Sequence, residues 1–258
     1  MTTPAAPEPI RTVEARLRAH PVVSVVVLQV AVAVLTVGGA FVLGVLVPTL
    51  PGYSVTGPSQ SLVLVVVLAV LAVLVVAALR WWPQVGLTPV SQWRDLRFYW
   101  LPVVLLAAPL VAGLKVPASS TVAVLLIGYV ATAVFEEIVW RGVIVDVLRP
   151  LGVWPAVLGS SLLFGLGHLS NSALRGFSVL ILLQAFGAAV QGVGLAALRL
   201  RTNTIWPLIA IHALHDLSLQ LGTLPIAAVE APISTIICVY GIYLLRGGRG
   251  EPAPPSAG

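Results

Sequence analysis

Residues 61–79 read SLVLVVVLAVLAVLVVAAL, a run of nineteen residues without a charged side chain. A helix that crosses a bilayer needs about 20 predominantly apolar residues, because the hydrocarbon core is about 30 Å thick. This run therefore predicts a transmembrane helix. If other stretches of the chain follow the same pattern, the chain folds as a bundle of helices surrounded by lipid.

The composition of the whole chain agrees with a membrane protein. Of its 258 residues, 59% are hydrophobic and 9% are charged, and the mean hydropathy is +1.04. A soluble domain carries about 25% charged residues, so this chain has too few of them to cover a water-facing surface. We therefore expect an all-α, polytopic membrane protein.

The same counts exclude two kinds of site. The net charge is +5, but the fourteen Lys and Arg residues are scattered singly and form no basic patch for nucleic acid. The one cysteine, Cys238, lies in an apolar run, which excludes a disulfide framework and a cysteine metal site. The lipid bilayer is the partner that the composition predicts.

Eight segments are long and apolar enough to be spans, although the third is short enough to be re-entrant. They are residues 22–49, 60–80, 99–114, 119–147, 154–170, 177–199, 204–221 and 229–246. Between the second and the third, residues 81–99 mix tryptophans with arginines, which is typical of the headgroup zone. There we expect an interfacial helix, with a polar loop as the alternative.

The distribution of positive charge tests this count of spans. With the N-terminus in the cytoplasm, eleven of the fourteen Lys and Arg residues fall on the cytoplasmic side. Lys115 and Arg175 fall outside, and Arg141 lies within a span. This bias follows the positive-inside rule. It predicts eight helices in the inner membrane, with both termini in the cytoplasm.

The two ends of the chain are expected to lie outside the membrane. Residues 1–20 hold three prolines and three arginines and precede an apolar run too long for a cleavable signal, so we expect a disordered cytoplasmic tail and an uncleaved first span. Residues 249–258 are rich in proline and predict a second disordered tail. Between the tails we expect N-terminal membrane helices with the interfacial segment at 21–118, a membrane core at 119–221 and a last transmembrane helix at 222–248.

Ionisable residues within spans are informative about function, because each costs about 2.5–3.5 kcal/mol at mid-helix on an insertion scale. The fourth span contains Glu136, Glu137 and Arg141. Glu137 and Arg141 are four residues apart on one helical face, in the favourable order, and are expected to pair. Glu136 lies about 100° away around the helix and has no local partner. A structural clamp therefore explains Glu137 and Arg141 well but explains Glu136 poorly.

Two further spans carry histidines. In the fifth span, Phe164 and His168 are four residues apart and share a face, and in the seventh His212 and Asp216 do the same. Glu136 lies about 14 residues before the loop between the fourth and fifth spans and His168 about 17 after it, so antiparallel helices bring both to a similar depth. His212 also lies near mid-membrane. The sequence thus predicts a buried catalytic site between helices four, five and seven.

These residue types suit the hydrolysis of a carbonyl compound. A carboxylate beside a histidine can take a proton from water, and a second histidine can stabilise the oxyanion that the attack creates. Glutamate and histidine are also ligands for zinc, although the HExxH signature is absent. Water activation by the side chains alone and catalysis by zinc both stay open at this point.

The spacing of these residues resembles the signature of the CAAX-protease and bacteriocin-processing (CPBP) family of intramembrane endopeptidases. That signature places Glu-Glu-x-x-x-Arg, Phe-x-x-x-His and His-x-x-x-Asn or Asp on three membrane helices. It is matched here by Glu136-Glu137 with Arg141, Phe164 with His168, and His212 with Asp216. The resemblance covers about residues 119–221.

The resemblance implies roles for these residues. Glu136 and His168 would activate water, and His212 and Asp216 would stabilise the oxyanion or help to bind the water. The supporting residues would be Glu137, Arg141 and Phe164. Asn often stands at the position of Asp216, and an ionised Asp cannot donate a hydrogen bond to an oxyanion. We therefore expect Asp216 to be protonated, to orient His212 or to bind a metal.

The sequence thus predicts an endopeptidase that hydrolyses a peptide bond of a membrane-associated protein or peptide by glutamate- and histidine-activated water. No cofactor is expected; if the enzyme depends on zinc, the ligands are Glu136, His168 and His212. The alternatives are a non-enzymatic immunity or regulatory protein that binds a partner's membrane segment, and a transporter that uses these residues as a proton relay. Every residue of the signature is present, which favours the enzyme.

Overall fold

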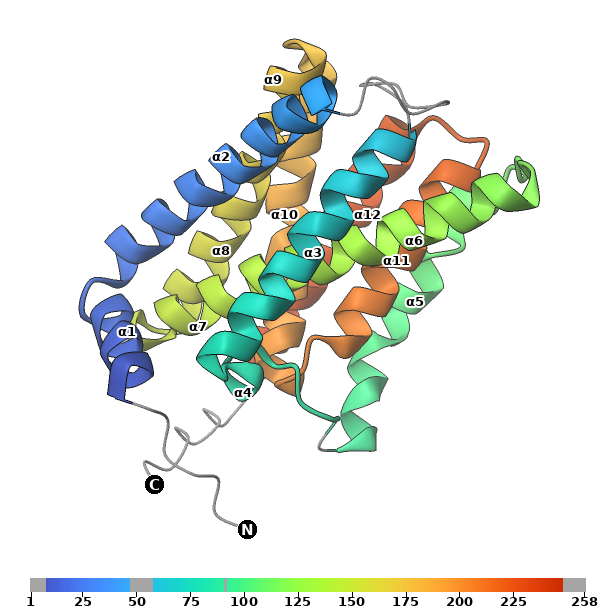
Figure 1. Cartoon of the computed structure of the whole chain (residues 1–258). Coiled ribbons are helices and arrows are strands. Elements are labelled where there is room, and N and C mark those ends of the chain that lie inside the picture. The colour runs from blue at the N-terminus through green and yellow to red at the C-terminus, as the bar shows by residue number, and fades with distance from the viewer. Residues whose placement is uncertain (1–7, 47–57, 91, 248–258) are drawn as a thin grey trace.

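Helices form the regular structure of the residues that the computed structural model describes, namely 8–46, 58–90 and 92–247 (Figure 1). The α-helices are α1 (Glu8–Ala19), α2 (Pro21–Leu46), α3 (Pro58–Leu79), α4 (Trp82–Val85), α5 (Trp100–Leu105), α6 (Ser119–Glu136), α7 (Val145–Leu148), α8 (Val153–His168), α9 (Ser170–Arg175), α10 (Val179–Thr202), α11 (Trp206–Leu221) and α12 (Ile226–Gly247). Three short segments, η1 (Trp93–Tyr99), η2 (Ala108–Leu110) and η4 (Arg149–Leu151), are 3-10 helices, and η3 (Glu137–Ile144) is a π-helix.

Six helical stretches of the described chain are long and apolar enough to cross a membrane. They are Pro21–Val45, Leu62–Leu79, Ser119–Leu151, Val153–Ala173, Val179–Thr202 and Ile226–Gly247. Their outer faces carry large apolar side chains, such as Phe41 at 72% and Phe186 at 71% exposure. Such faces need lipid around them, because in water they would expose a large, continuous apolar surface. The expected all-α polytopic membrane class is confirmed.

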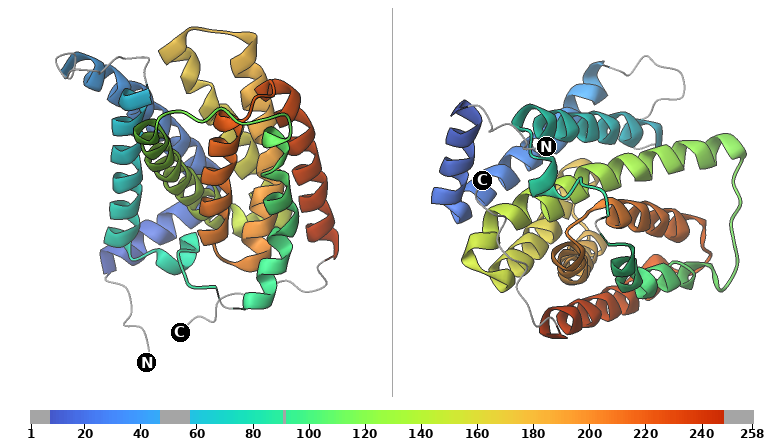
Figure 2. Two further views of the ribbon diagram at one scale, coloured as in Figure 1. Left: turned by 90° about the vertical axis from the view of Figure 1, so that its right-hand side faces the viewer. Right: turned by 90° about the horizontal axis from the view of Figure 1, so that it is seen from below.

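The two other expected spans are shorter. The segment 99–114 is broken into α5 and η2, because the ring of Pro109 clashes with the carbonyl of Leu105, four residues earlier, and ends α5 there. Helix α11 has 16 residues, about 24 Å of helix. Both segments nevertheless run alongside the longer helices (Figure 2). The count of eight crossings stays a prediction.

Hydrogen bonds tie both ends of α11 to the segment between α4 and α6, which contains α5. At one end the Ile205 amide donates to the Gly86 carbonyl. At the other end the Lys115 amide donates to the Leu221 carbonyl over 2.7 Å. Helix α11 and the segment 86–115 therefore cover the same depth of the bundle.

The packing of the long helices places α6 at the centre of the site-bearing half. Helix α6 packs against α3 on one side and α11 on the other, while α10 packs between α8 and α12 (Figure 1). The π-helical continuation of α6 then packs against α8. One end of α6, the middle of α11 and the end of α8 consequently surround one point.

Two local expectations need correction. Residues 8–19, expected to be disordered, form α1, in which Arg18 pairs with Glu14 at 3.0 Å and reaches Asp146 of α7 at 2.9 Å. An i, i+4 pair and a docking partner together stabilise the helix. The expected disordered tail at 249–258 lies outside the described residues. The start of α1 and the end of α12 lie at the same end of the bundle (Figure 2), and their side of the membrane stays a prediction.

The expected interfacial helix at 81–99 is instead two short pieces. Helix α4 ends at Val85 because Gly86 adopts a left-handed conformation, with φ of 79°, and residues 87–90 and 92 lie outside the helices. The second piece is η1. The expected span at 119–147 is one continuous helical stretch, within which residues Glu137–Ile144 form the π-helix η3.

Candidate active site

The acidic pair of the fourth span lies where α6 gives way to η3. Glu136 is the last residue of α6, and Glu137 is the first residue of η3. A π-helix uses i→i+5 hydrogen bonds and is frequent at functional sites. Arg141 Nη1 lies 3.4 Å from Glu137 Oε1, and both side chains are fully buried. The predicted Glu137–Arg141 pair is therefore present in spite of the change of helix type.

His212 of α11 lies between the two glutamates. Its Nδ1 is 2.7 Å from Glu137 Oε1, and since an ionised carboxylate only accepts, Nδ1 is the donor. Its Nε2 faces the other way, 3.5 Å from Glu136 Oε2 and 3.8 Å from Asp216 Oδ2. Glu136, which has no partner on its own helix, thus has one on α11.

The ring of Phe164 on α8 joins the three motifs. It makes edge-to-face contacts with two imidazoles, at centroid distances of 4.8 Å to His168 and 6.3 Å to His212. The guanidinium of Arg141 lies over the same ring, 3.8 Å from its centroid. A desolvated cation over an aromatic face gains about 2 kcal/mol. Phe164 therefore acts as a spacer that the two imidazoles and the guanidinium of Arg141 all contact.

His168 is held by its own helix. Its Nδ1 lies 3.0 Å from the backbone carbonyl oxygen of Phe164. A carbonyl can only accept, so Nδ1 carries the hydrogen of the neutral imidazole. Nε2 is then the nitrogen with a free lone pair, and it can take a proton from water.

The cluster has a closed side and an open side. The side chains of Glu137 and Arg141 are 0% exposed, whereas those of His212, Glu136 and Asp216 are 11%, 17% and 26% exposed. The residues that can reach a substrate are therefore Glu136, His212 and Asp216, joined by the half-buried His168. Glu137 and Arg141 can act only through their neighbours.

Side chains from further helices fix the η3 segment. Trp140 Nε1 donates to Gln29 Oε1 of α2 over 3.1 Å, and Ser160 Oγ of α8 donates to the Trp140 carbonyl over 2.7 Å. Trp140 also contacts Phe164 edge to face, with centroids 5.4 Å apart. The π-helical turn that carries Arg141 is thus held from two sides.

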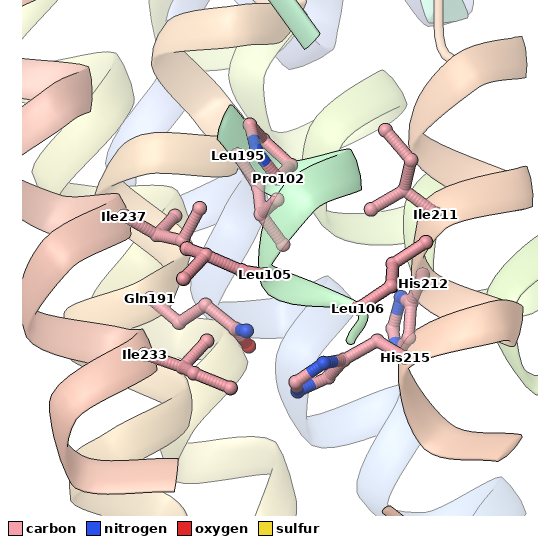
Figure 3. A pocket seen from close by; sticks show the side chains of 10 residues that line it. All are labelled: Pro102, Leu105, Leu106, Gln191, Leu195, Ile211, His212, His215, Ile233 and Ile237. Carbon is pink, nitrogen blue, oxygen red and sulfur yellow. The ribbon is translucent and has the colours of Figure 1, made fainter. Parts of the chain in front are cut away.

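Sequence reasoning missed one contact beside the site. His215 Nε2 lies 2.8 Å from Oε1 of Glu230 on α12. Glu230 is an ionisable residue within an expected span, and this signal could have singled it out. His215 and His212 both line a cavity between α5, α10, α11 and α12 (Figure 3).

The zinc alternative requires three ligands that converge. Among the described side chains, no group of three His, Cys, Asp or Glu residues is arranged to hold a metal ion. The set Glu136, His168 and His212 therefore does not form a ready ligand cluster in this arrangement. Whether the reaction uses a metal stays a prediction for chelation to test.

Comparison with known families agrees with this arrangement. Residues 118–218 match the family described as type II CAAX prenyl endopeptidase Rce1-like. No curated protein and no solved structure matches the chain. The matched residues include all seven members of the signature, from Glu136 to Asp216. The resemblance to CAAX-type intramembrane endopeptidases is thereby confirmed over residues 118–218, where the chain is similar to the Rce1-like family.

Proposed function

We propose that the chain is an intramembrane endopeptidase in which Glu136 and His168 activate the attacking water. One observation carries the proposal: residues of three motifs, on three helices, meet around His212 and Phe164. The partly exposed groups of this cluster are two acids and two histidines, and these are the residue types that acid–base hydrolysis needs.

In the proposed reaction a water molecule binds between Glu136 and His168. His168 Nε2 takes one proton while the water oxygen bonds to the carbonyl carbon of the substrate, and Glu136 accepts a hydrogen bond from the second proton. The carbonyl oxygen becomes an oxyanion, to which the doubly protonated His212 donates from Nε2–H while its Nδ1–H stays bonded to Glu137. When the C–N bond breaks, the proton held by His168 passes to the leaving amine.

The buried residues position this machinery. The bond from His212 Nδ1–H to Glu137 fixes the orientation of the ring, so that Nε2 is the nitrogen that faces the substrate side. Arg141 offsets the charge of Glu137, and Asp216 orients His212 from the open side. This role for Asp216 needs no hydrogen of its own, so an ionised Asp can serve where an amide is more usual.

The substrate is proposed to be a membrane-associated protein or peptide. The family description names CAAX prenyl endopeptidases, so a farnesylated peptide that ends in a CAAX sequence is the first probe. A leader peptide and a membrane-protein segment are the other two substrate classes that a test should include.

The test uses the purified protein in liposomes with internally quenched reporters of these three classes. Glu136→Gln keeps the shape of the side chain but removes the negative charge that binds and polarises the attacking water, and cleavage should fall at least about 100-fold. Glu14→Gln, which changes a carboxylate of α1 away from the site, is the matched control and should cleave as the wild type does.

Three outcomes would count against the proposal. Near-normal cleavage by Glu136→Gln would remove Glu136 from water activation. If the wild type cleaves none of the reporters but binds one of them, the non-enzymatic reading is favoured. Proton-coupled uptake of a solute by the liposomes would favour the transporter.

A further inference from the structure

The buried indole of Trp140 lies behind the residues that are proposed to activate water. It contacts Phe135, which directly precedes Glu136, edge to face, with centroids 5.7 Å apart. On α8 a Cβ at Gly167, the residue before His168, would lie 2.8 Å from Trp140 Cζ2. The position of the indole therefore sets the distance between the helix of Glu136 and the helix of His168.

Gln29 of α2 is the partner that fixes the indole. Trp140 Nε1 donates to Gln29 Oε1 over 3.1 Å. A buried Trp N–H needs such an acceptor, because a buried donor without a partner loses the hydrogen bond that it makes to water. The amide of Gln29 also lies near the same glycine, since its Nε2 would be 3.4 Å from a Cβ at Gly167. The indole and the amide thus both use the space that this glycine leaves open beside His168.

The proposed reaction does not explain why α2 carries an amide at this position. Apart from Gln29, residues 21–46 hold two polar side chains, the hydroxyls of Ser24 and Thr36. Amide side chains in membrane helices form hydrogen bonds across helices. Gln29 is half-buried and lies outside residues 118–218, which match the family. It thus reaches the site from a part of the chain that the three motifs do not include.

We propose that Gln29 is a positioning residue of the reaction, which acts through Trp140 on the separation of Glu136 and His168. The inference rests on the proposed endopeptidase function, because the water has to fit between these two side chains. Without the acceptor, the indole N–H must turn toward another acceptor, and α8 and η3 repack around it. A misplacement of about 1 Å can lower a rate about 100-fold, so a small shift of the indole is enough to be measured.

An anchoring role is the competing explanation, in which the bond only ties α2 to the bundle. Helix α2 also packs against α7, α8 and α9, so it has other contacts that hold it (Figure 1). Loss of an anchor lowers the midpoint of thermal unfolding and the folded yield, and it leaves kcat and KM of the folded protein unchanged. Loss of positioning lowers kcat of the folded protein and leaves KM unchanged, because no contact with the substrate is removed.

The first experiment measures kcat and KM of folded, monodisperse protein for the reporter class that the wild type cleaves fastest. Gln29→Met keeps the length of the side chain but removes the acceptor, and it should lower kcat about tenfold with KM within about twofold. Gln29→Glu keeps an oxygen acceptor in either protonation state and should restore kcat to near the wild-type value. Ser24→Ala removes another side-chain bond of α2, to the Leu17 carbonyl over 3.2 Å, and should leave kcat unchanged. A wild-type kcat for Gln29→Met, or a change in KM alone, would overturn the proposal.

A double-mutant cycle tests whether Gln29 acts through the indole. Trp140→Phe keeps an aromatic ring but removes the N–H donor, and it should also lower kcat. In the Trp140→Phe background, Gln29→Met should change kcat by less than about twofold, since the bond is already absent. Two effects that multiply would show that Gln29 acts by another route, and the proposal would fail.

An NMR measurement on purified protein in detergent separates this inference from the proposed function, because it needs no cleavage. With the histidines labelled at Cε1, the resonance of His168 is identified by its loss in His168→Gln. Gln29→Met should shift this resonance, whereas Ser24→Ala should leave it in place. A shift without any cleavage by the wild type would overturn the endopeptidase and keep Gln29 as the residue that positions His168. Cleavage by the wild type without a shift in Gln29→Met would overturn the inference alone, and absence of both would overturn both.

Discussion

Replacing Arg141 by methionine should destabilise the protein strongly, because Glu137 would keep its charge in a fully buried place. The two charges are 3.4 Å apart at 0% exposure. With an effective dielectric constant of about 20, their attraction is about 5 kcal/mol. Breaking a buried pair by removing one partner typically costs about 3–5 kcal/mol. Methionine fills most of the volume of the arginine stem, so the loss reports on charge more than on packing.

The assay is thermal unfolding of purified protein in detergent, followed by tryptophan fluorescence. Arg141→Met should lower the midpoint by on the order of 10 °C. The double variant Glu137→Gln/Arg141→Met should recover more than half of that loss, since no unpaired charge remains. Arg16→Met, at an exposed position of α1, should leave the midpoint unchanged. A stable Arg141→Met, or a double variant less stable than the single one, would refute the buried-pair reasoning.

Three further predictions concern topology, packing and metal. In a cysteine-free background of intact cells, a cysteine at the exposed Ser119 should react with an impermeant thiol reagent and one at the exposed Gln92 should not; the reverse would invert the orientation. Gly194→Val should greatly reduce the folded yield, because a Cβ at Gly194 would overlap the Ile237 carbonyl oxygen. Prolonged chelation should leave cleavage intact, and Asp216→Asn should preserve or raise it, because an amide can donate to the oxyanion; activity lost on chelation and restored by zinc would establish a metal enzyme.

The sequence predicted the membrane class and the meeting of the motifs for separate physical reasons. Uncharged runs near 20 residues have few alternatives to a spanning helix. Ionisable residues within such runs must find partners, and helical spacing limits which partners they reach. This reasoning paired Glu137 with Arg141 and placed Glu136, His168 and His212 at one depth, and contacts now link all of these residues.

Other features could not be predicted, because they depend on contacts between distant segments. The π-helix η3 is held by Gln29 of α2 and Ser160 of α8, and no local sequence pattern predicts either contact. The helix at 8–19 docks through Arg18 on Asp146, more than a hundred residues away. Glu230 could have been singled out as an ionisable residue within a span, but the sequence does not show that its partner is His215 of another helix.

The position of Glu136 gives a last test of whether the site serves catalysis or only holds the helices together. Three carboxylates, those of Glu136, Glu137 and Asp216, lie within 3.8 Å of His212, and Arg141 is the partner of one of them. A clamp needs only Glu137 and Arg141, so the fold gains little from Glu136, which adds repulsion between acids. Sites built for function often retain such a cost.

Glu136→Gln should therefore unfold at the same temperature as the wild type or a few degrees higher, while cleavage of the reporters is lost. The measurement is the same thermal unfolding, with Glu137→Gln beside it as a matched control in the adjacent residue. Glu137→Gln should lower the midpoint, because it leaves Arg141 buried without its counter-ion. If Glu136→Gln lowers the midpoint as much as Glu137→Gln does, Glu136 belongs to the clamp. Its carboxylate would then be explained by packing, and the proposed reaction would lose the residue that binds the attacking water.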